Sequence, residues 1–145
     1  MVSRRVSIAL VSLVVSLTVG CGSKPVTGVL LPRTGEASAY GDSIASGVEL
    51  AVKEAQKLGT VPEGFEVLWA DTESDPETGL AELRRLARER SVHLVIGGAT
   101  SAEAAALVPH LEDLDVVCVS PSATAPELTK QSRFFFRIYP SDELE

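Results

Sequence analysis

Short apolar runs recur along the chain from Val26 onward, and longer segments with a helical repeat of apolar residues separate them. Runs of four to six mostly apolar residues between turn-forming residues are typical of buried β-strands. The pattern predicts five strands, at residues 26–31, 65–70, 92–96, 116–119 and 134–139.

The first intervening segment predicts a helix that follows a loop through residues 40–42 and stops at Gly59. Its apolar positions recur at helical spacing: Ile44, Val48, Ala51, Val52, Ala55 and Leu58. The second helix starts where Asp75 can cap it and Pro76 can occupy its first position. Its buried stripe consists of Leu80, Leu83, Leu86 and Ala87.

A third helix is predicted to begin at Thr100 or Ser101 and to run through Leu107 towards Leu111, with Thr100 and Glu103 spaced as a capping box. Residues 125–130 predict a short fourth helix. Strands that alternate with helices in this way form a parallel sheet with helices on both faces, so the predicted class is α/β, a three-layer doubly wound parallel sheet. Ligands of such sheets bind beyond the carboxyl ends of the strands.

The first 20 residues look like an export signal. Arg4 and Arg5 precede an uncharged, mostly apolar run of 15 residues, which is shorter than the roughly 20 residues of a permanent membrane span. Cys21 follows Gly20 and resembles the acylated cysteine of a bacterial lipobox, although Thr18 stands where that motif usually has leucine. We therefore expect a lipoprotein signal peptide at 1–20, lipidation of Cys21, a tether through residue 25 and one lobe at 26–145. Ordinary secretory cleavage is the alternative.

Composition narrows the possible functions. The 145 residues are 45% hydrophobic and 23% charged, which suits one globular domain. The net charge is −7, and Arg4 and Arg5 are the only charged residues among the first 20, so the remainder is more acidic still. Binding of nucleic acid needs a basic face and is not expected.

The sequence contains little evidence for catalytic residues. Gly97 and Gly98 precede a helix start, which favours an anion, but neither GxGxxG nor GxxxxGK[ST] is present. A serine hydrolase needs a histidine base, and the GxSxG elbow is also absent. His93 is predicted within the third strand, facing a helix or the core, and His110 at the surface. No catalytic residue is predicted.

No metal site or cofactor is expected either. Cys118 lies in an apolar run and reads as a small buried hydrophobe, and no metal-ligand spacing is found. Asp71, Glu73 and Asp75 crowd one loop and could hold a divalent cation. Capping of a helix by Asp75 and solvation of the other two carboxylates account for them better.

Four stretches in the right order resemble the type I periplasmic solute-binding proteins of the leucine/isoleucine/valine-binding branch. They are "GVLLPRTGEASAYGDSIASGVELAVKEA", "DTESDPETG", "LVIGGATSAEAAA" and "VSPSATAPELT" followed by "FFFRIYPSD". The resemblance covers nearly everything after residue 25. It implies two α/β lobes that close on an amino acid or similar solute, which an ABC transporter permease then receives on the periplasmic or cell-surface side of the membrane.

The resemblance also implies a set of ligand-binding residues. Ser101 would donate its hydroxyl to the ligand's carboxylate, Ser122 would offer its carbonyl to the ammonium group, and Thr124 would contribute its hydroxyl and N–H. Ala123 lies between them, and Tyr40 would form a wall of the pocket. An unpaired buried charge costs several kcal/mol, so several donors at one place suit a carboxylate. The alternative is purely structural, since Ser101 and Thr124 can each cap a helix.

The chain departs from the family in its length. It ends at Glu145, where the family continues towards a second lobe, so we expect one lobe, from a fragment or truncated product or with a partner chain supplying the rest. A lone lobe should bind weakly because water competes for each hydrogen bond. Two other readings remain open: a ligand sensor or amide-responsive regulator with the same fold, and a hydrolase, which would lose turnover on Ser101→Ala.

Overall fold

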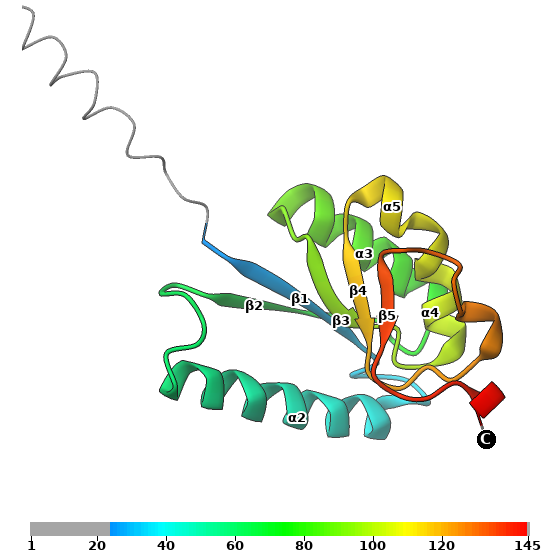
Figure 1. The fold of residues 1–145 in the computed structure, drawn as a ribbon, viewed down its shortest axis with the longest axis horizontal. Helices are drawn as coiled ribbons and strands as arrows, with labels where there is room; N and C mark the ends of the chain where they lie inside the picture. Colours follow the sequence, from blue (N-terminus) through cyan, green and yellow to red (C-terminus); the bar gives the residue numbers. More distant parts are fainter. Residues whose placement is uncertain (1–23, 145) are drawn as a thin grey trace, which may run out of the picture.

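The computed structural model describes residues 24–144 of the chain (Figure 1). The predicted signal peptide and Cys21 lie outside these residues. Within them, no helix combines the length and the apolar character that a membrane span requires. The elements in chain order are β1 (Val26–Leu31), α2 (Ser38–Lys57), β2 (Glu66–Asp71), α3 (Pro76–Arg90), β3 (Leu94–Gly97), α4 (Ser101–Leu107), η1 (Val108–His110), α5 (Leu111–Leu114), β4 (Val117–Ser120), η2 (Pro126–Leu128), β5 (Phe135–Arg137) and η3 (Asp142–Leu144).

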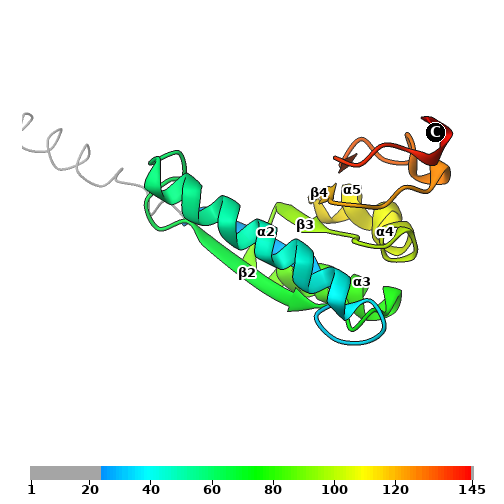
Figure 2. The ribbon, with the colours of Figure 1, turned by 90° about the horizontal axis from the view of Figure 1, so that it is seen from below.

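The strands form one parallel sheet in the order β2-β1-β3-β4-β5. Helix α2 packs on one face, and α3, α4 and α5 pack on the other (Figure 1). Seen from below, α2 runs over β2 and β1 and leaves β4 uncovered (Figure 2). The predicted three-layer doubly wound architecture is therefore confirmed.

Alternation of side chains along the strands creates two separate cores. On the face of α3, α4 and α5, fully buried Leu30 and Val95 pack against Leu83 and Leu107. On the opposite face, Val29 and Leu31 pack against helix α2, which contributes buried Ala45 and half-buried Ile44 and Val48. The face with three helices has the larger core, so most of the hydrophobic stabilisation comes from that side.

Helix α2 begins earlier than predicted. The expected loop through residues 40–42 is wrong, because the helix already starts at Ser38. Its first turns carry mostly polar or small residues and so show no apolar repeat. Gly41, which interrupts the sequence pattern, is buried where the helix backbone passes close to Pro32 at the end of β1.

Other boundaries follow local chemistry. Asp75 caps α3 by accepting a 2.7 Å hydrogen bond from the Thr78 amide, and the capping box of Thr100 and Glu103 forms on α4, as predicted.

The prediction of a helix at residues 125–130 is wrong, because this segment forms only the 3₁₀ turn η2. Ala125 is the residue before this turn, and it makes no side-chain cap. The fifth strand is shorter than predicted and ends at Arg137.

Candidate functional site

The sheet has a switch point between β1 and β3. From β1 the chain proceeds through α2 to β2 at one edge, whereas from β3 it proceeds through α4 to β4 and then β5 at the other. The connections at the carboxyl ends of these two neighbouring strands therefore diverge, and ligands of doubly wound sheets bind at such a point. The loops after β3 and β4 lie on the same side of the switch point.

A buried serine ties these two loops together. Ser120 is fully buried, and its hydroxyl donates a 2.7 Å hydrogen bond to the carbonyl of Gly98 and accepts one of 3.0 Å from the Ala123 amide. The Ser122 hydroxyl adds a second tie, at 2.6 Å, to the carbonyl of Ala99. The loops after β3 and β4 therefore form one unit. The sequence pattern did not single out Ser120, although its place at the last position of a buried strand was a signal.

Ser101 links the same loops from the other side. Its half-buried hydroxyl oxygen accepts hydrogen bonds from the amides of Thr124, at 3.3 Å, and Ala125, at 3.2 Å. A hydroxyl accepts two hydrogen bonds and donates one, so its hydrogen is left for another acceptor. The structure thus brings Ser101, Ser122, Ala123 and Thr124 together.

Thr124 differs from expectation in two respects. Its amide, expected to contact a ligand, donates to Ser101, and its carbonyl accepts from the Asp142 amide at 3.1 Å. The alternative that Thr124 caps a helix is wrong, because the residue before η2 is Ala125 and this turn has no side-chain cap. Among residues 24–144, no hydrogen bond engages the hydroxyl of Thr124, in contrast to its amide and its carbonyl.

A buried carboxylate supports the start of α4. Glu103 is 2% exposed, and one of its oxygens accepts hydrogen bonds from the amide and the hydroxyl of Thr100, at 3.0 and 3.1 Å. The other oxygen accepts from the hydroxyl of Thr72, which is 1% exposed and follows β2. Glu103 therefore joins the loop after β2 to the helix turn that carries Ser101.

Tyr40 is not part of this hydrogen-bonded group. It belongs to the first turn of α2 rather than to a loop, and 47% of it is exposed. Within residues 24–144 it makes no hydrogen bond to Ser101 or to the loop after β4. Its role as a wall of the pocket stays a prediction.

The loop after β1 is held by Asp71. This carboxylate accepts hydrogen bonds from the Arg33 amide at 2.8 Å, the Thr34 hydroxyl at 2.8 Å and the Glu73 amide at 2.8 Å. Burial acts to raise the pKa of Asp71, and the hydrogen bonds from Glu73, Thr34 and Arg33 outweigh it, so the pKa lies below its ordinary value.

The expectation that the Asp71 carboxylate is simply solvated is wrong, because it accepts these hydrogen bonds from the protein. No cluster of potential metal ligands occurs among the described residues.

We expect Asp71→Asn to lower the free energy of unfolding by about 1 kcal/mol at pH 7, a modest loss because the site is partly exposed. The lowered pKa means that the native carboxylate stabilises the fold above about pH 4 and loses this contribution as pH falls through the folded-state pKa. Asn does not titrate, so the difference in stability between the two proteins should shrink as the pH falls below about 4. Urea unfolding at pH 7 and at successively lower pH values measures this, and a difference that grows on acidification would contradict it.

Two further residues lie outside the site. The expectation that His93 faces a helix or the core is wrong, because it precedes β3, its side chain is exposed and its Nδ1 lies 2.9 Å from the carbonyl oxygen of Asp115. Cys118 is fully buried, as predicted, and burial raises the pKa of its thiol to about 12. A thiol with that pKa is unreactive at neutral pH.

Comparison with known proteins agrees with this geometry. The profile of the family described as "periplasmic binding protein" matches residues 27–144. A Leu/Ile/Val-binding protein from Rhizobium johnstonii is 34% identical over 105 residues, which are 72% of this chain and 28% of that protein. A leucine-, isoleucine-, valine-, threonine- and alanine-binding protein from Pseudomonas aeruginosa is 29% identical and covers 79% of this chain.

Solved structures of binding proteins for branched-chain amino acids are also similar to this chain. The branched-chain amino acid transporter substrate binding protein of Streptococcus pneumoniae, in complex with isoleucine, superposes with a TM-score of 0.76 at 30% identity, over 82% of this chain and 34% of that one. A leucine binding protein from Thermotoga maritima gives a TM-score of 0.75 at 29% identity, over 83% and 34%. This chain thus spans about a third of the length of these relatives.

Proposed function

Because the chain belongs to the periplasmic binding protein family, whose profile matches residues 27–144, we propose that it is the N-terminal lobe of a solute-binding protein for amino acids or similar small polar molecules. Its fold is that of type I periplasmic binding proteins. The observation that carries the proposal is the hydroxyl of Ser101, which is fixed by two amides of the loop after β4 and has its hydrogen left to donate at the switch point.

The site offers donors that suit a carboxylate. Within residues 24–144, the first turn of α4 satisfies the amides of Thr100 and Glu103 internally, and those of Ser101 and Ala102 have no protein acceptor. These two N–H groups, the Ser101 hydroxyl and the Thr124 hydroxyl would meet a carboxylate. A helix N-terminus favours such an anion electrostatically.

The ammonium group of an amino acid needs acceptors instead. We assign this contact to the carbonyl of Ser122, beside Ala123, in the loop after β4. Neutral hydroxyl and backbone groups bind a zwitterion without a fixed countercharge, which suits repeated capture and release. Members of this family are binding proteins rather than enzymes, and we propose the same for this chain.

Transport is the corresponding role in the cell. We propose that the protein is exported, that Cys21 carries a lipid anchor at the membrane, and that an ABC transporter permease receives the solute. The names of the relatives support this role, since they include substrate-binding proteins of branched-chain amino acid transporters.

The test is to titrate the full chain with leucine and isoleucine and to follow backbone amide signals by NMR. We expect shifts at Ser101, Ala123 and Thr124. Leucinamide lacks the carboxylate and N-acetylleucine lacks the ammonium group, so each should bind about tenfold more weakly or worse, because one set of buried polar groups is left unpaired.

In the same titration, Ser101→Ala should weaken leucine binding about tenfold, since it removes one hydrogen bond to a charged group. Ser46→Ala is the matched control, an exposed serine of α2 whose hydroxyl bonds only to Asp42 within the described residues, and it should leave binding unchanged. The proposal is wrong if neither amino acid shifts any signal up to its solubility limit, or if leucinamide and leucine bind equally well.

A further inference from the structure

Strand β2 forms one edge of the sheet, and its outer side carries unpaired backbone groups. The amides of Glu66 and Thr72 donate to carbonyls along β1, so every second residue from 66 to 72 turns its N–H and C=O groups towards β1. Val67 and Trp69 lie between them and direct both groups away from the sheet. Within residues 24–144, β2 pairs with β1 alone, and no other backbone hydrogen bond reaches these two residues.

This edge has little of the protection that edge strands usually carry. Strand β2 has six residues, against three in β5 at the other edge. Its charged residues stand only at its ends, at Glu66 and Asp71, with no lysine or proline between them. Natural proteins commonly block an exposed edge with lysine, proline or a bulge, because unpaired backbone groups recruit a further strand. Strand β2 is therefore available to another strand.

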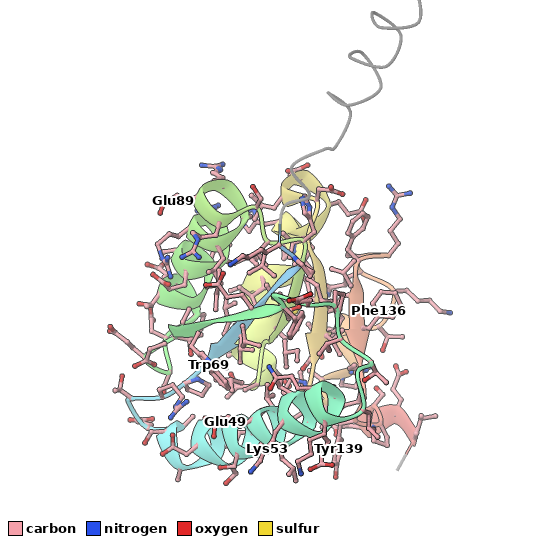
Figure 3. The ribbon with its side chains drawn as sticks, turned by 90° about the vertical axis from the view of Figure 1, so that its left-hand side faces the viewer. Glu49, Lys53, Trp69, Glu89, Phe136 and Tyr139 are labelled. Atoms are coloured by element: carbon pink, nitrogen blue, oxygen red, sulfur yellow. The ribbon has the colours of Figure 1, made fainter. Side chains whose placement is uncertain are left out.

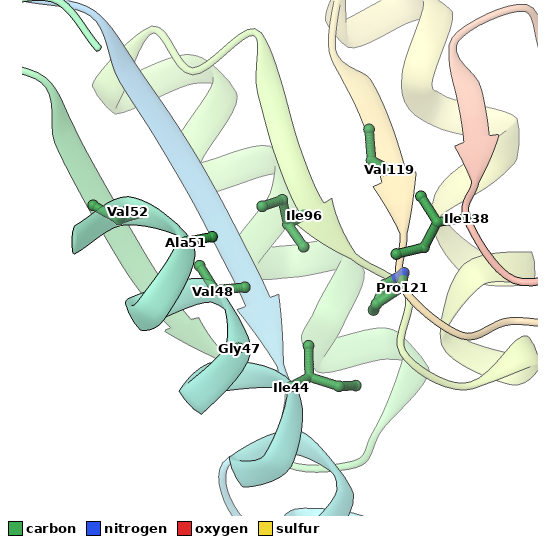
Figure 4. Close-up of a pocket in the computed structure, with 9 residues that line it drawn as sticks. All are labelled: Ile44, Gly47, Val48, Ala51, Val52, Ile96, Val119, Pro121 and Ile138. Carbon is green, nitrogen blue, oxygen red and sulfur yellow. The ribbon is translucent and has the colours of Figure 1, made fainter. Parts of the chain in front are cut away.

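Helix α2 places charges of both signs beside the edge. Figure 3 shows Trp69 between β2 and α2, and this side chain is 38% exposed. A shallow hollow of about 180 Å³ at this place is lined by Val67 and Trp69 of the strand and by Glu49, Val52, Lys53 and Gln56 of the helix. Figure 4 shows Val52 on the β2 side of α2. Glu49 and Lys53 are exposed, and neither forms an ion pair among residues 24–144.

We propose that β2 pairs antiparallel with β2 of a second copy of this chain, about a two-fold axis at Leu68, so that the two sheets join into one. This axis sets Val67 opposite Trp69 of the second copy, and the symmetry forms this pair twice. Both residues direct their backbone groups outward, as hydrogen bonding across the axis requires. An aromatic residue opposite a β-branched one is also a favourable cross-strand pair. Glu66 then lies opposite Ala70, so the strand ends bring no like charges together.

The same axis makes the charges on α2 complementary. Helix α2 runs antiparallel to β2, because Gly41 near its start lies against Pro32 at the end of β1. Glu49 therefore lies nearer the carboxyl end of the strand than Lys53 does, by about 6 Å along the helix axis. The two-fold axis reverses this order in the second copy, so each Glu49 comes opposite the other copy's Lys53. A surface that is complementary to itself suits a second copy of the chain better than an unrelated strand.

Trp69 is the only tryptophan in the sequence, so its fluorescence reports on the proposed interface. Sedimentation equilibrium of the full chain over about 1 to 500 µM should show a monomer–dimer equilibrium, because a single added strand pair makes a small, reversible interface. Over this range the emission of Trp69 should shift to shorter wavelength, and acrylamide should quench it less.

Amide hydrogen exchange followed by NMR locates the contact. The amides of Val67 and Trp69 should exchange rapidly in the monomer and become protected in the dimer. The amide of Leu68 points towards β1 and should be protected at every concentration. This alternation along one strand is specific to pairing at the outer edge of β2.

Exchange of charges tests the proposed register. At low ionic strength, Glu49→Lys and Lys53→Glu should each raise the dimer dissociation constant about tenfold, because each sets like charges opposite each other twice. The double variant restores opposite charges across the axis and should dimerise as the native chain does. Lys130→Glu is the matched control, since it makes the same change of net charge at an exposed residue after η2, and it should leave the dimer unchanged.

A chain that stays monomeric up to about 500 µM would overturn the proposal. So would a dimer in which the amides of Val67 and Trp69 still exchange rapidly, because its interface would lie elsewhere. Equal weakening by Lys130→Glu and Lys53→Glu, or a double variant that does not recover, would also contradict it. The solute site lies at the switch point between β1 and β3, so the charge variants should bind leucine as the native chain does, and a failure of either proposal leaves the other standing.

Discussion

Gly41→Ala is expected to lower the free energy of unfolding by about 3 kcal/mol or more. A Cβ atom at this position would lie 2.0 Å from the carbonyl oxygen of Pro32 and 2.7 Å from its carbonyl carbon. Both are backbone atoms just beyond β1, so they cannot move aside as the end of a flexible side chain can. Helix α2 would have to shift away from the sheet, and urea unfolding followed by circular dichroism measures the loss.

Gly47→Ala provides the matched control in the same helix. Its Cβ would meet nothing, and alanine is favoured over glycine within a helix, so we expect a gain of about 0.5 to 1 kcal/mol. The two substitutions are chemically identical and should have opposite signs. If Gly41→Ala also stabilised the protein, the close approach of α2 to Pro32 would be wrong.

Glu103→Ala is expected to lower the free energy of unfolding by about 3 kcal/mol. The carboxylate is the common acceptor for Thr72 and Thr100, and its removal leaves the hydroxyl of Thr72 buried without an acceptor. The link between the loop after β2 and the start of α4 is lost as well. Chemical denaturation measures the stability, and amide exchange at Thr100 and Ser101 reports on the helix start.

Two variants test whether the effect comes from this network. Glu89→Ala removes an exposed carboxylate near the end of α3 and should change stability by less than about 0.5 kcal/mol. Glu103→Gln keeps one acceptor oxygen and should lie between the native protein and Glu103→Ala. A loss for Glu89→Ala as large as that for Glu103→Ala would argue against a specific role of the buried network.

The order of elements could be predicted because it depends on local pattern. The strands form four- to six-residue apolar runs, and their alternation with helices leaves few possible topologies. Asp75 and the capping box of Thr100 and Glu103 were predictable for the same reason, since the residues that form each cap lie within three positions of each other. Tertiary structure does not override such local signals, because they depend on few contacts with distant residues.

The residue at which α2 starts and the conformation of residues 125–130 depend on tertiary contacts. Gly41 interrupts a helical pattern, but here it is glycine because Pro32 lies against it. After Pro126 the helix does not continue, because the carbonyl of Ala125 accepts a 2.9 Å hydrogen bond from Arg137 of β5 and Thr129 is already extended. Neither contact has a signature in the local sequence.

The candidate site shows the same difference between local motifs, which the sequence reveals, and contacts between distant residues, which it does not. The resemblance to the solute-binding family, which rests on local motifs, pointed to Ser101 and the loop after β4 as ligand-binding residues. It did not reveal that Ser101 and Thr124 bond to each other or that Ser120 fastens the loops, since these contacts join residues about 20 positions apart.

The paired amides at Ser101 also bear on the entropy of binding. A serine hydroxyl is ordinarily a rotor whose hydrogen samples several directions. With Thr124 and Ala125 donating to its two lone pairs, one tetrahedral direction is left for the hydrogen, whether or not a solute is present. The freedom that an unconstrained hydroxyl would lose when it binds a solute has then already been lost during folding.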